Sequence, residues 1–373
     1  MTAPIPLARP EITAEERRLV DEVLSSAALS RGPMVRAFEA AMAEYVGSAH
    51  AVAVSSGSAA LHLALKALDL PADAEVITSP FGVPATPNMI LAAGARVRFA
   101  DIRADSLALD PAAVREAISS QTTAVIPVHV YGQPAPLDGL LEVCQPSHLA
   151  LVEDACEALG TRLDGRHLGT FGRVGCFGFY PNKQLTTGEG GVLVTDDDAL
   201  AHRLRRLRNH GREMDGRWLD QEEPGLNYRL PELSAALGLG QIRRFDEIAE
   251  RRAAAAARYR QRLSDVPGLE VPPALDHVCW FSWVVQLKNA ALRDPLAGLL
   301  AADGIQTGRY FAPLHQQPGL QSRVPPDARF PVTERVAARV LALPLFNTIS
   351  AQQIDRVCDR LTHHLTALGA AGS

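Results

Sequence analysis

The sequence predicts an α/β protein with a mainly parallel sheet that is sandwiched by helices, followed by a smaller C-terminal α/β domain. Short apolar runs alternate with segments that can be helical from about residue 50 to 200, which is typical of such sheets. Hydrophobic residues make up 47% of the 373 residues, enough for a sizeable core. A long helical stretch then separates this region from the C-terminal part.

The predicted strands are the short apolar runs of this alternating region. The helix after the first run is expected over Ala59–Leu68. The runs are Ala51–Val54, Glu75–Thr78, Arg96–Ala100, Thr123–Val128, Leu149–Val152, Val174–Phe179 and Gly191–Thr195. Since ligands bind at the carboxyl ends of the strands in such sheets, we expect the site in the loops that follow them.

Helical patterns frame this sheet at both ends of the chain. Ala14–Ser25 is expected to form a helix that packs on the small domain. A further helical region begins near Leu233 and continues through Ala253–Ala257. In the C-terminal part, Trp280–Leu287 is expected to be a strand and Thr333–Leu341 a helix. We therefore divide the chain into residues 1–240, the large domain, and residues 241–373, the connecting helix and small domain.

Composition excludes several classes of function. The net charge of -5 gives no electrostatic reason to expect nucleic acid or an anionic membrane as partner. No apolar run approaches the ~18 residues of a membrane span, and the first residues do not resemble a signal peptide. The five cysteines are scattered without a C-x-x-C pair, so we expect no zinc site, no other metal and a cytoplasmic location.

Two candidate binding elements follow predicted strands. Ser55–Ala60 opens a helix, and its free N–H groups, with Gly57 and Ser58, suit a phosphate; the alternative is an ordinary N-capped helix. There is neither a P-loop nor a dinucleotide fingerprint. Asp154 ends another strand, where a carboxylate can keep a pyridinium nitrogen protonated; the alternative is an acid that caps a turn.

The strongest signal is Lys183, in a loop rich in turn formers between two predicted strands. A lysine amine presented at a strand end and partly desolvated can form a Schiff base with a carbonyl cofactor. The alternative is a solvated loop lysine. A fourth segment, Pro224–Leu230, carries Asn227 and Arg229, which suit phosphate or carboxylate, although a structural turn explains it equally well.

Taken together, these motifs resemble the DegT/DnrJ/EryC1/StrS family of sugar aminotransferases. The matching stretches occur in family order and span most of the chain. They are Ser56–Leu65, Glu153–Gly160, Phe177–Gly191, Gly225–Gly238 and Arg309–His315. The resemblance implies the fold type I architecture of transferases that depend on pyridoxal 5'-phosphate (PLP). It also implies a homodimer with shared active sites.

The resemblance also assigns roles to residues. Lys183 matches the Schiff-base lysine, Asp154 the acid paired with the pyridine nitrogen, and Glu157 a position, often Gln, near the cofactor's phenolic oxygen. Gly57 and Ser58 match the phosphate-binding pair. Asn227 matches the asparagine that reaches the phosphate from the partner subunit. The candidate substrate-binding residues are Tyr180, Arg229, Tyr310 and His315.

Two positions depart from the family pattern. The family often has Ser five residues before the lysine, where this chain has Gly178, so one phosphate contact is expected to be absent. The aromatic residue that stacks on the cofactor ring falls on Val83 by simple alignment, or on Phe81 after a loop shift; we favour Val83.

The resemblance predicts transfer of an amino group from L-glutamate to a keto group of a nucleotide-linked deoxysugar, with the C4 position favoured, by ping-pong transamination through Lys183. A keto-cyclitol acceptor is an alternative within the family. Two alternatives come from other classes: a dinucleotide-dependent oxidoreductase, and a non-catalytic regulator that binds the same cofactor.

Overall fold

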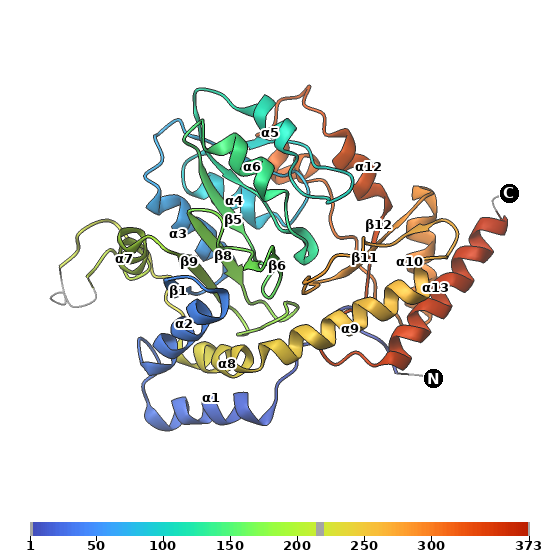
Figure 1. Ribbon diagram of the computed structural model, residues 1–373, viewed down its shortest axis with the longest axis horizontal. Coiled ribbons are helices and arrows are strands. Elements are labelled where there is room, and N and C mark those ends of the chain that lie inside the picture. The colour runs from blue at the N-terminus through green and yellow to red at the C-terminus, as the bar shows by residue number, and fades with distance from the viewer. Residues whose placement is uncertain (1–2, 214–219, 372–373) are drawn as a thin grey trace.

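The computed structural model describes residues 3–213 and 220–371. Its main sheet has seven strands in the order β1-β9-β8-β5-β4-β2-β3 (Figure 1). Five of them, from β8 to β3, run parallel, whereas β9 is antiparallel to both of its neighbours. The strands are β1 (His50–Val54), β2 (Glu75–Thr78), β3 (Arg96–Phe99), β4 (Thr122–Ile126), β5 (Ala150–Asp154), β8 (Val174–Gly178) and β9 (Gly191–Thr195). The predicted mainly parallel sheet is confirmed.

Helices cover both faces of this sheet because alternate strand residues point to opposite sides. Val52 and Val54 of β1 pack with one set of helices, and Ala51 and Ala53 with the other. The first set is α3 (Gly57–Ala67), α4 (Ala85–Ala92) and α7 (Asp198–Leu207). The second set is α2 (Pro33–Val46), α5 (Pro111–Ala117), α6 (Leu137–Cys144) and α8 (Glu232–Arg243). A small hairpin, β6 (Arg162–Leu163) and β7 (Arg166–His167), follows β5.

A second, three-stranded antiparallel sheet forms the C-terminal part, in the order β10-β11-β12. Its elements are α9 (Phe245–Leu263), β10 (Leu269–Glu270), β11 (Trp283–Leu287), α10 (Arg293–Ala302), α11 (Pro318–Gln321), α12 (Pro331–Arg339), β12 (Val340–Leu343) and α13 (Ala351–Ala371). Figure 1 shows α9 leading from the main sheet to this part, where it packs against α13. The division of the chain at residue 240 stays a prediction.

Two C-terminal boundaries differ from the sequence prediction. The expected strand over Trp280–Leu287 begins only at Trp283. The expected helix over Thr333–Leu341 ends at Arg339, because Val340 and Leu341 pair with β11 as part of β12. Strand partners earlier in the chain, Gln286 for Val340 and Val285 for Leu341, therefore override the helical pattern.

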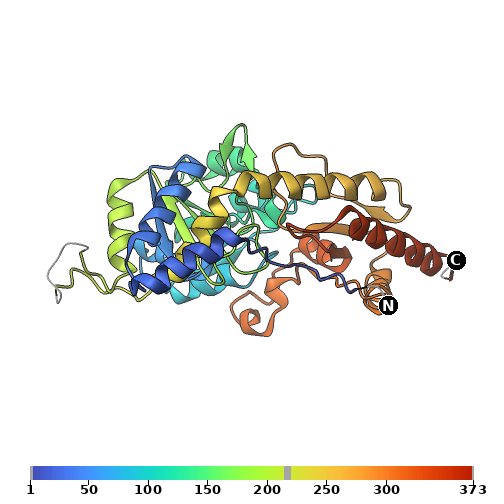
Figure 2. The same ribbon diagram turned by 90° about the horizontal axis from the view of Figure 1, so that it is seen from below.

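The prediction that the first helix packs on the small domain is wrong. Helix α1 (Ala14–Ser26) packs on α8 (Figure 2). Its buried Leu19 and Val23 belong to the main core. The buried Glu16 accepts a hydrogen bond from Arg244 Nε at 2.8 Å, which fixes this position. The preceding segment reaches the small domain instead, through a bridge between Ile5 and Ile305.

Candidate active site

A cavity of about 390 Å³ opens at the carboxyl edge of the main sheet. Its walls are the loops that follow β1, β2, β4, β5 and β8, closed by side chains from the C-terminal part of the chain. Nine of the twelve predicted site residues line it: Gly57, Ser58, Val83, Asp154, Glu157, Gly178, Tyr180, Lys183 and Tyr310. Residues from five separate loops thus converge on one space.

Lys183 lies in the turn after β8, where its backbone N–H donates to the Tyr180 carbonyl at 2.9 Å. The side chain is only 12% exposed. Its Nζ lies 3.2 Å from Glu157 Oε1 and 4.1 Å from the centroid of the Phe281 ring. The amine is therefore held between a carboxylate and an aromatic face, with little access to water.

Asp154, the last residue of β5, is buried and its carboxylate is fixed by two donors. Oδ2 accepts a hydrogen bond from Thr86 Oγ1 at 2.6 Å, and Oδ1 accepts one from the Cys156 N–H at 3.2 Å. A carboxylate held in this way at a cavity wall can form a charge-assisted hydrogen bond with a protonated ring nitrogen.

Glu157 is almost fully buried and uses its two oxygens differently. Oε2 accepts the Tyr131 backbone N–H at 2.9 Å, whereas Oε1 faces Lys183. Tyr131 has the left-handed backbone conformation, with φ of 60°, which is uncommon for a residue other than glycine. Burial raises the pKa of Glu157 above its ordinary value, although Lys183 and the Tyr131 N–H oppose this effect.

The start of α3 lies directly on the end of β8. Ser56 caps the helix, since its side chain accepts the Ala59 N–H at 3.0 Å, and the N–H groups of the first turn have no partner within the helix. A Cβ on Gly57 would lie 2.9 Å from Cys156 Sγ and 3.1 Å from Gly178 Cα. A side chain at position 57 would therefore force its neighbours apart, whereas a Cβ on Gly178 would be tight, 3.2 Å from Cys156 Sγ. The close approach leaves the helix N-terminus open to an anion.

The two candidates for a ring-covering side chain occupy different places. Val83 is 39% exposed and lines the cavity. Phe81 is only 1% exposed and packs on Tyr131 and Phe311, with ring centroids 6.2 Å and 6.0 Å apart. Val83 therefore lines the cavity and Phe81 does not, and the assignment of Val83 as the ring-covering residue stays a prediction.

The structure does not bring three predicted residues to this cavity. Arg229 Nη1 donates to Asn209 Oδ1 at 3.0 Å, beside a smaller cavity that Arg31, Arg36, Arg205 and Arg208 also line. Asn227 forms a backbone bridge with Asn209. His315 is buried elsewhere, 3.0 Å from Glu334 of α12 and against the ring of Phe330.

Sequence patterns missed several side chains of the site. Thr86, whose hydroxyl donates to Asp154, lies three residues after Val83. A hydroxyl side chain so close to a predicted site residue could have identified it as a hydrogen-bond donor of the site. Phe281 and Phe311 form the wall near Lys183 with Tyr310, whose ring stacks on both. Phe311 lies in the matching stretch Arg309–His315 but was given no role there, and no motif marks Phe281, which reaches the site from a distant part of the chain.

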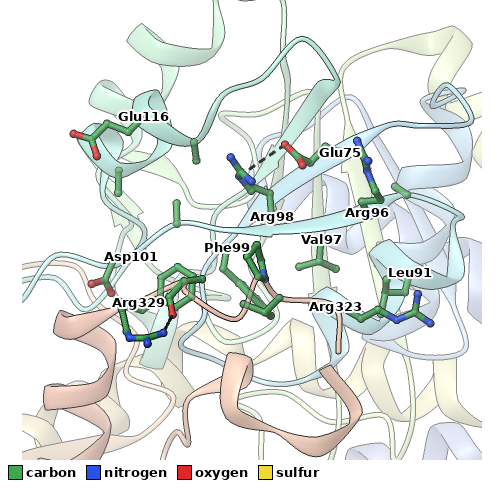
Figure 3. Close-up of a pocket in the computed structure, with 18 of the residues that line it drawn as sticks. Glu75, Leu91, Arg96, Val97, Arg98, Phe99, Asp101, Glu116, Arg323 and Arg329 are labelled. Atoms are coloured by element: carbon green, nitrogen blue, oxygen red, sulfur yellow. Dashed lines mark hydrogen bonds and ion pairs between the residues drawn. The ribbon is translucent and has the colours of Figure 1, made fainter. Parts of the chain in front are cut away.

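A larger cavity, of about 800 Å³, lies along the free edge of β3. Figure 3 shows Arg96 and Arg98 on this strand and Arg323 and Arg329 on the segment that faces it, with Glu75 4.0 Å from Arg98. Among the described residues, its lining includes no lysine, serine, cysteine or histidine. Charged side chains along a free strand edge discourage pairing with another chain, which explains the arginines here. The cavity that contains Lys183 is therefore the candidate active site.

Neither a metal centre nor a membrane helix is found within residues 3–213 and 220–371. No group of three or more His, Cys, Asp or Glu side chains is arranged to hold a metal ion. No helix there is long and apolar enough to cross a bilayer.

Comparisons with known proteins agree with this geometry. The model of the DegT/DnrJ/EryC1/StrS aminotransferase family matches residues 10–362. The spore coat polysaccharide biosynthesis protein SpsC of Bacillus subtilis (strain 168) is 38% identical over 371 residues, with 95% of each chain covered.

Two solved structures are similar to the chain over nearly its whole length. DesI, solved in the presence of its TDP-sugar product, is 36% identical with a TM-score of 0.89 and covers 99% of this chain and 96% of its own. DesV of S. venezuelae, solved with a ketimine intermediate, is 35% identical with a TM-score of 0.92 and covers 97% and 98%. The matches confirm the family resemblance and the predicted fold.

Proposed function

Because the chain belongs to the DegT/DnrJ/EryC1/StrS aminotransferase family and is a PLP-dependent aminotransferase, we propose that it moves an amino group from L-glutamate to a nucleotide-linked keto-deoxysugar. One observation carries this proposal. The cavity combines a shielded lysine amine, a fixed carboxylate and an open helix N-terminus. Transamination through a phosphorylated pyridine aldehyde requires these three groups.

The residues present fit pyridoxal phosphate by the chemistry of their donors and acceptors. Lys183 would hold the aldehyde carbon, Asp154 the ring nitrogen, and the start of α3 with Ser58 the phosphate. The contact between Gly57 and Gly178 leaves this N-terminus without a covering side chain. When bound, the cofactor supplies a ring that withdraws electrons from the substrate's α carbon.

The protein's own groups then move the protons. With the cofactor bound, the free Nζ of Lys183 would take a proton from the α carbon of glutamate and give it to the cofactor's aldehyde carbon; in the second half-reaction it would move a proton from that carbon to the sugar carbon that is aminated. Asp154 would hold the proton on the ring nitrogen. Phe281 and Tyr310, which stack on each other beside Lys183, limit the entry of water.

The sugar class is supported by the relatives. DesI was solved with a TDP-sugar product, and SpsC takes part in spore coat polysaccharide biosynthesis. The preference for the C4 position rests on the motifs around Asp154 and Lys183, which resemble those of enzymes that aminate this carbon of the sugar. A keto-cyclitol acceptor stays the alternative, and a screen of both acceptor classes separates them.

The proposal includes a homodimer. Asn227 and Arg229 lie away from their own cavity, on the segment before α8. We propose that Asn227 of the partner subunit reaches the cofactor phosphate. Arg229 is partly buried among other arginines, and burial lowers its pKa, so an anion from another subunit would be favoured there.

The test is an absorbance spectrum of the purified protein with pyridoxal phosphate, before and after L-glutamate. A visible band near about 420 nm that glutamate shifts supports the proposal. The Lys183→Ala variant is expected to lose both this band and transamination. Turnover retained in that variant would sink the assignment of Lys183.

A further inference from the structure

The carboxylate of Glu157 is built to face Lys183. Its Oε2 is fixed by the Tyr131 N–H, and its backbone carbonyl accepts Gln184 Nε2 at 2.6 Å. These two contacts hold the residue from both ends and leave Oε1 directed at the lysine amine, 3.2 Å away. The glutamine that the family often has here would be unable to accept a proton, whereas this side chain can.

We propose that Glu157 is the proton partner of Lys183: it holds the free amine as an ammonium ion and accepts a proton from it when the neutral amine is needed. This inference rests on the proposed function of the site. The proton passes from Nζ to Oε1, so an ion pair becomes an amine beside a carboxylic acid, and the return step restores the pair. Glu157 is thus a positioning residue that acts through Lys183.

The surroundings favour this exchange over a permanent ion pair. Burial raises the pKa of Glu157, so the protonated form is accessible. The other titratable and charged groups around the pair are Asp154, Cys156, Tyr131, Tyr180, Tyr310 and the exposed Glu189 of the same cavity. Asp154 is engaged by Thr86 and by the Cys156 N–H, and burial raises the pKa of Tyr131, Cys156 and Tyr310. Among the groups described, Glu157 is the carboxylate placed to exchange a proton with the amine.

The test measures the amine directly in the cofactor-free protein. The chain has three lysines, Lys66, Lys183 and Lys288, so trace labelling with acetic anhydride across a pH series can be quantified by peptide mass spectrometry. Lys66 and Lys288 serve as internal references. In Glu157→Gln, which keeps the shape and an oxygen for the Tyr131 N–H, the pH midpoint for labelling Lys183 is expected to fall by about one pH unit or more.

Two matched variants separate charge from shape. Glu157→Asp keeps the negative charge and is expected to keep a midpoint close to that of the wild type. Glu189→Gln removes an exposed carboxylate at the mouth of the same cavity and is expected to leave the midpoint unchanged. An unchanged midpoint in Glu157→Gln, or an equal fall in Glu157→Asp, overturns the inference.

A second readout distinguishes failure of this inference from failure of the proposed function. In the wild type, a visible band on adding pyridoxal phosphate tests the proposed function whether or not Glu157 exchanges a proton with Lys183. In Glu157→Gln, the lowest pH at which that band forms should fall together with the labelling midpoint. A wild-type band with no such change in the variant removes Glu157 from this role and leaves the aminotransferase assignment intact.

Discussion

Substituting Gly57 by alanine tests the contact on which the phosphate site depends. The new Cβ would lie 2.9 Å from Cys156 Sγ and 3.1 Å from Gly178 Cα, where ordinary contacts begin at 3.4 Å. The shortfalls are 3.4 - 2.9 = 0.5 Å and 3.4 - 3.1 = 0.3 Å. The second neighbour is backbone, so the start of α3 has to move away from β8.

This displacement has two measurable costs. Overpacking of this size typically destabilises a protein by about 1–3 kcal/mol. Moving the helix start also lengthens its hydrogen bonds to a bound phosphate, and losing one charge-assisted bond costs about 1.5–3 kcal/mol. We therefore expect a Tm lower by a few degrees, and an affinity for pyridoxal phosphate at least about tenfold weaker.

The assay is thermal unfolding with and without cofactor, together with a fluorescence titration of pyridoxal phosphate. Gly298→Ala is the matched control, because a Cβ there meets nothing within 4 Å and lies inside α10. That change is expected to stabilise the protein by about 0.5–1 kcal/mol. Adding Cys156→Ala to the Gly57 variant should recover part of the loss. Wild-type stability and affinity in Gly57→Ala would refute the close packing of α3 on β8.

Three further predictions concern charge and burial. Asp154→Asn should keep the cofactor bound but slow transamination by about 10²-fold or more, and an unchanged rate would remove Asp154 from its role. Burial lowers the pKa of His167 to about 4, so its contribution to stability is present above the unfolded value of about 6.5 and is lost as pH falls toward 4. Urea unfolding at pH 7.5 and 4.5 should therefore show a smaller loss in His167→Phe, which keeps a ring beside Tyr45. Arg252→Met should lower the free energy of unfolding by about 2–5 kcal/mol, because three buried oxygens lose their donor; a loss below 1 kcal/mol would contradict this.

The sequence predicted the main sheet closely because its signals are local. The runs Glu75–Thr78 and Gly191–Thr195 coincide with β2 and β9, and buried strands leave continuous apolar runs bounded by turn formers. The candidate site could be predicted from the sequence for the same reason. Asp154 ends β5, Gly178 ends β8 and Lys183 follows β8; these two strands run parallel, and parallel strands end at one edge of the sheet.

The remaining features depend on contacts between distant parts of the chain. Strand β12 pairs with β11, and helix α1 packs on α8. The local sequence of these segments does not indicate which part of the chain they contact. Phe281 is a further case, since an aromatic residue inside the predicted strand Trp280–Leu287 is expected to belong to the core. Only the position of Lys183, 98 residues earlier, makes its ring part of the site.

A hydrogen-bond network explains how Phe281 can stay beside Lys183. Arg252 of α9 is buried and donates to the carbonyls of Trp280 and Phe281, each at 2.7 Å. Gln184, the residue after Lys183, donates to the carbonyls of Cys279 and Glu157 at 2.9 Å and 2.6 Å. The backbones on both sides of the amine are therefore tied to each other through buried donors. Because every buried carbonyl in this link has a donor, the wall and the lysine resist moving apart, and the amine keeps its low exposure.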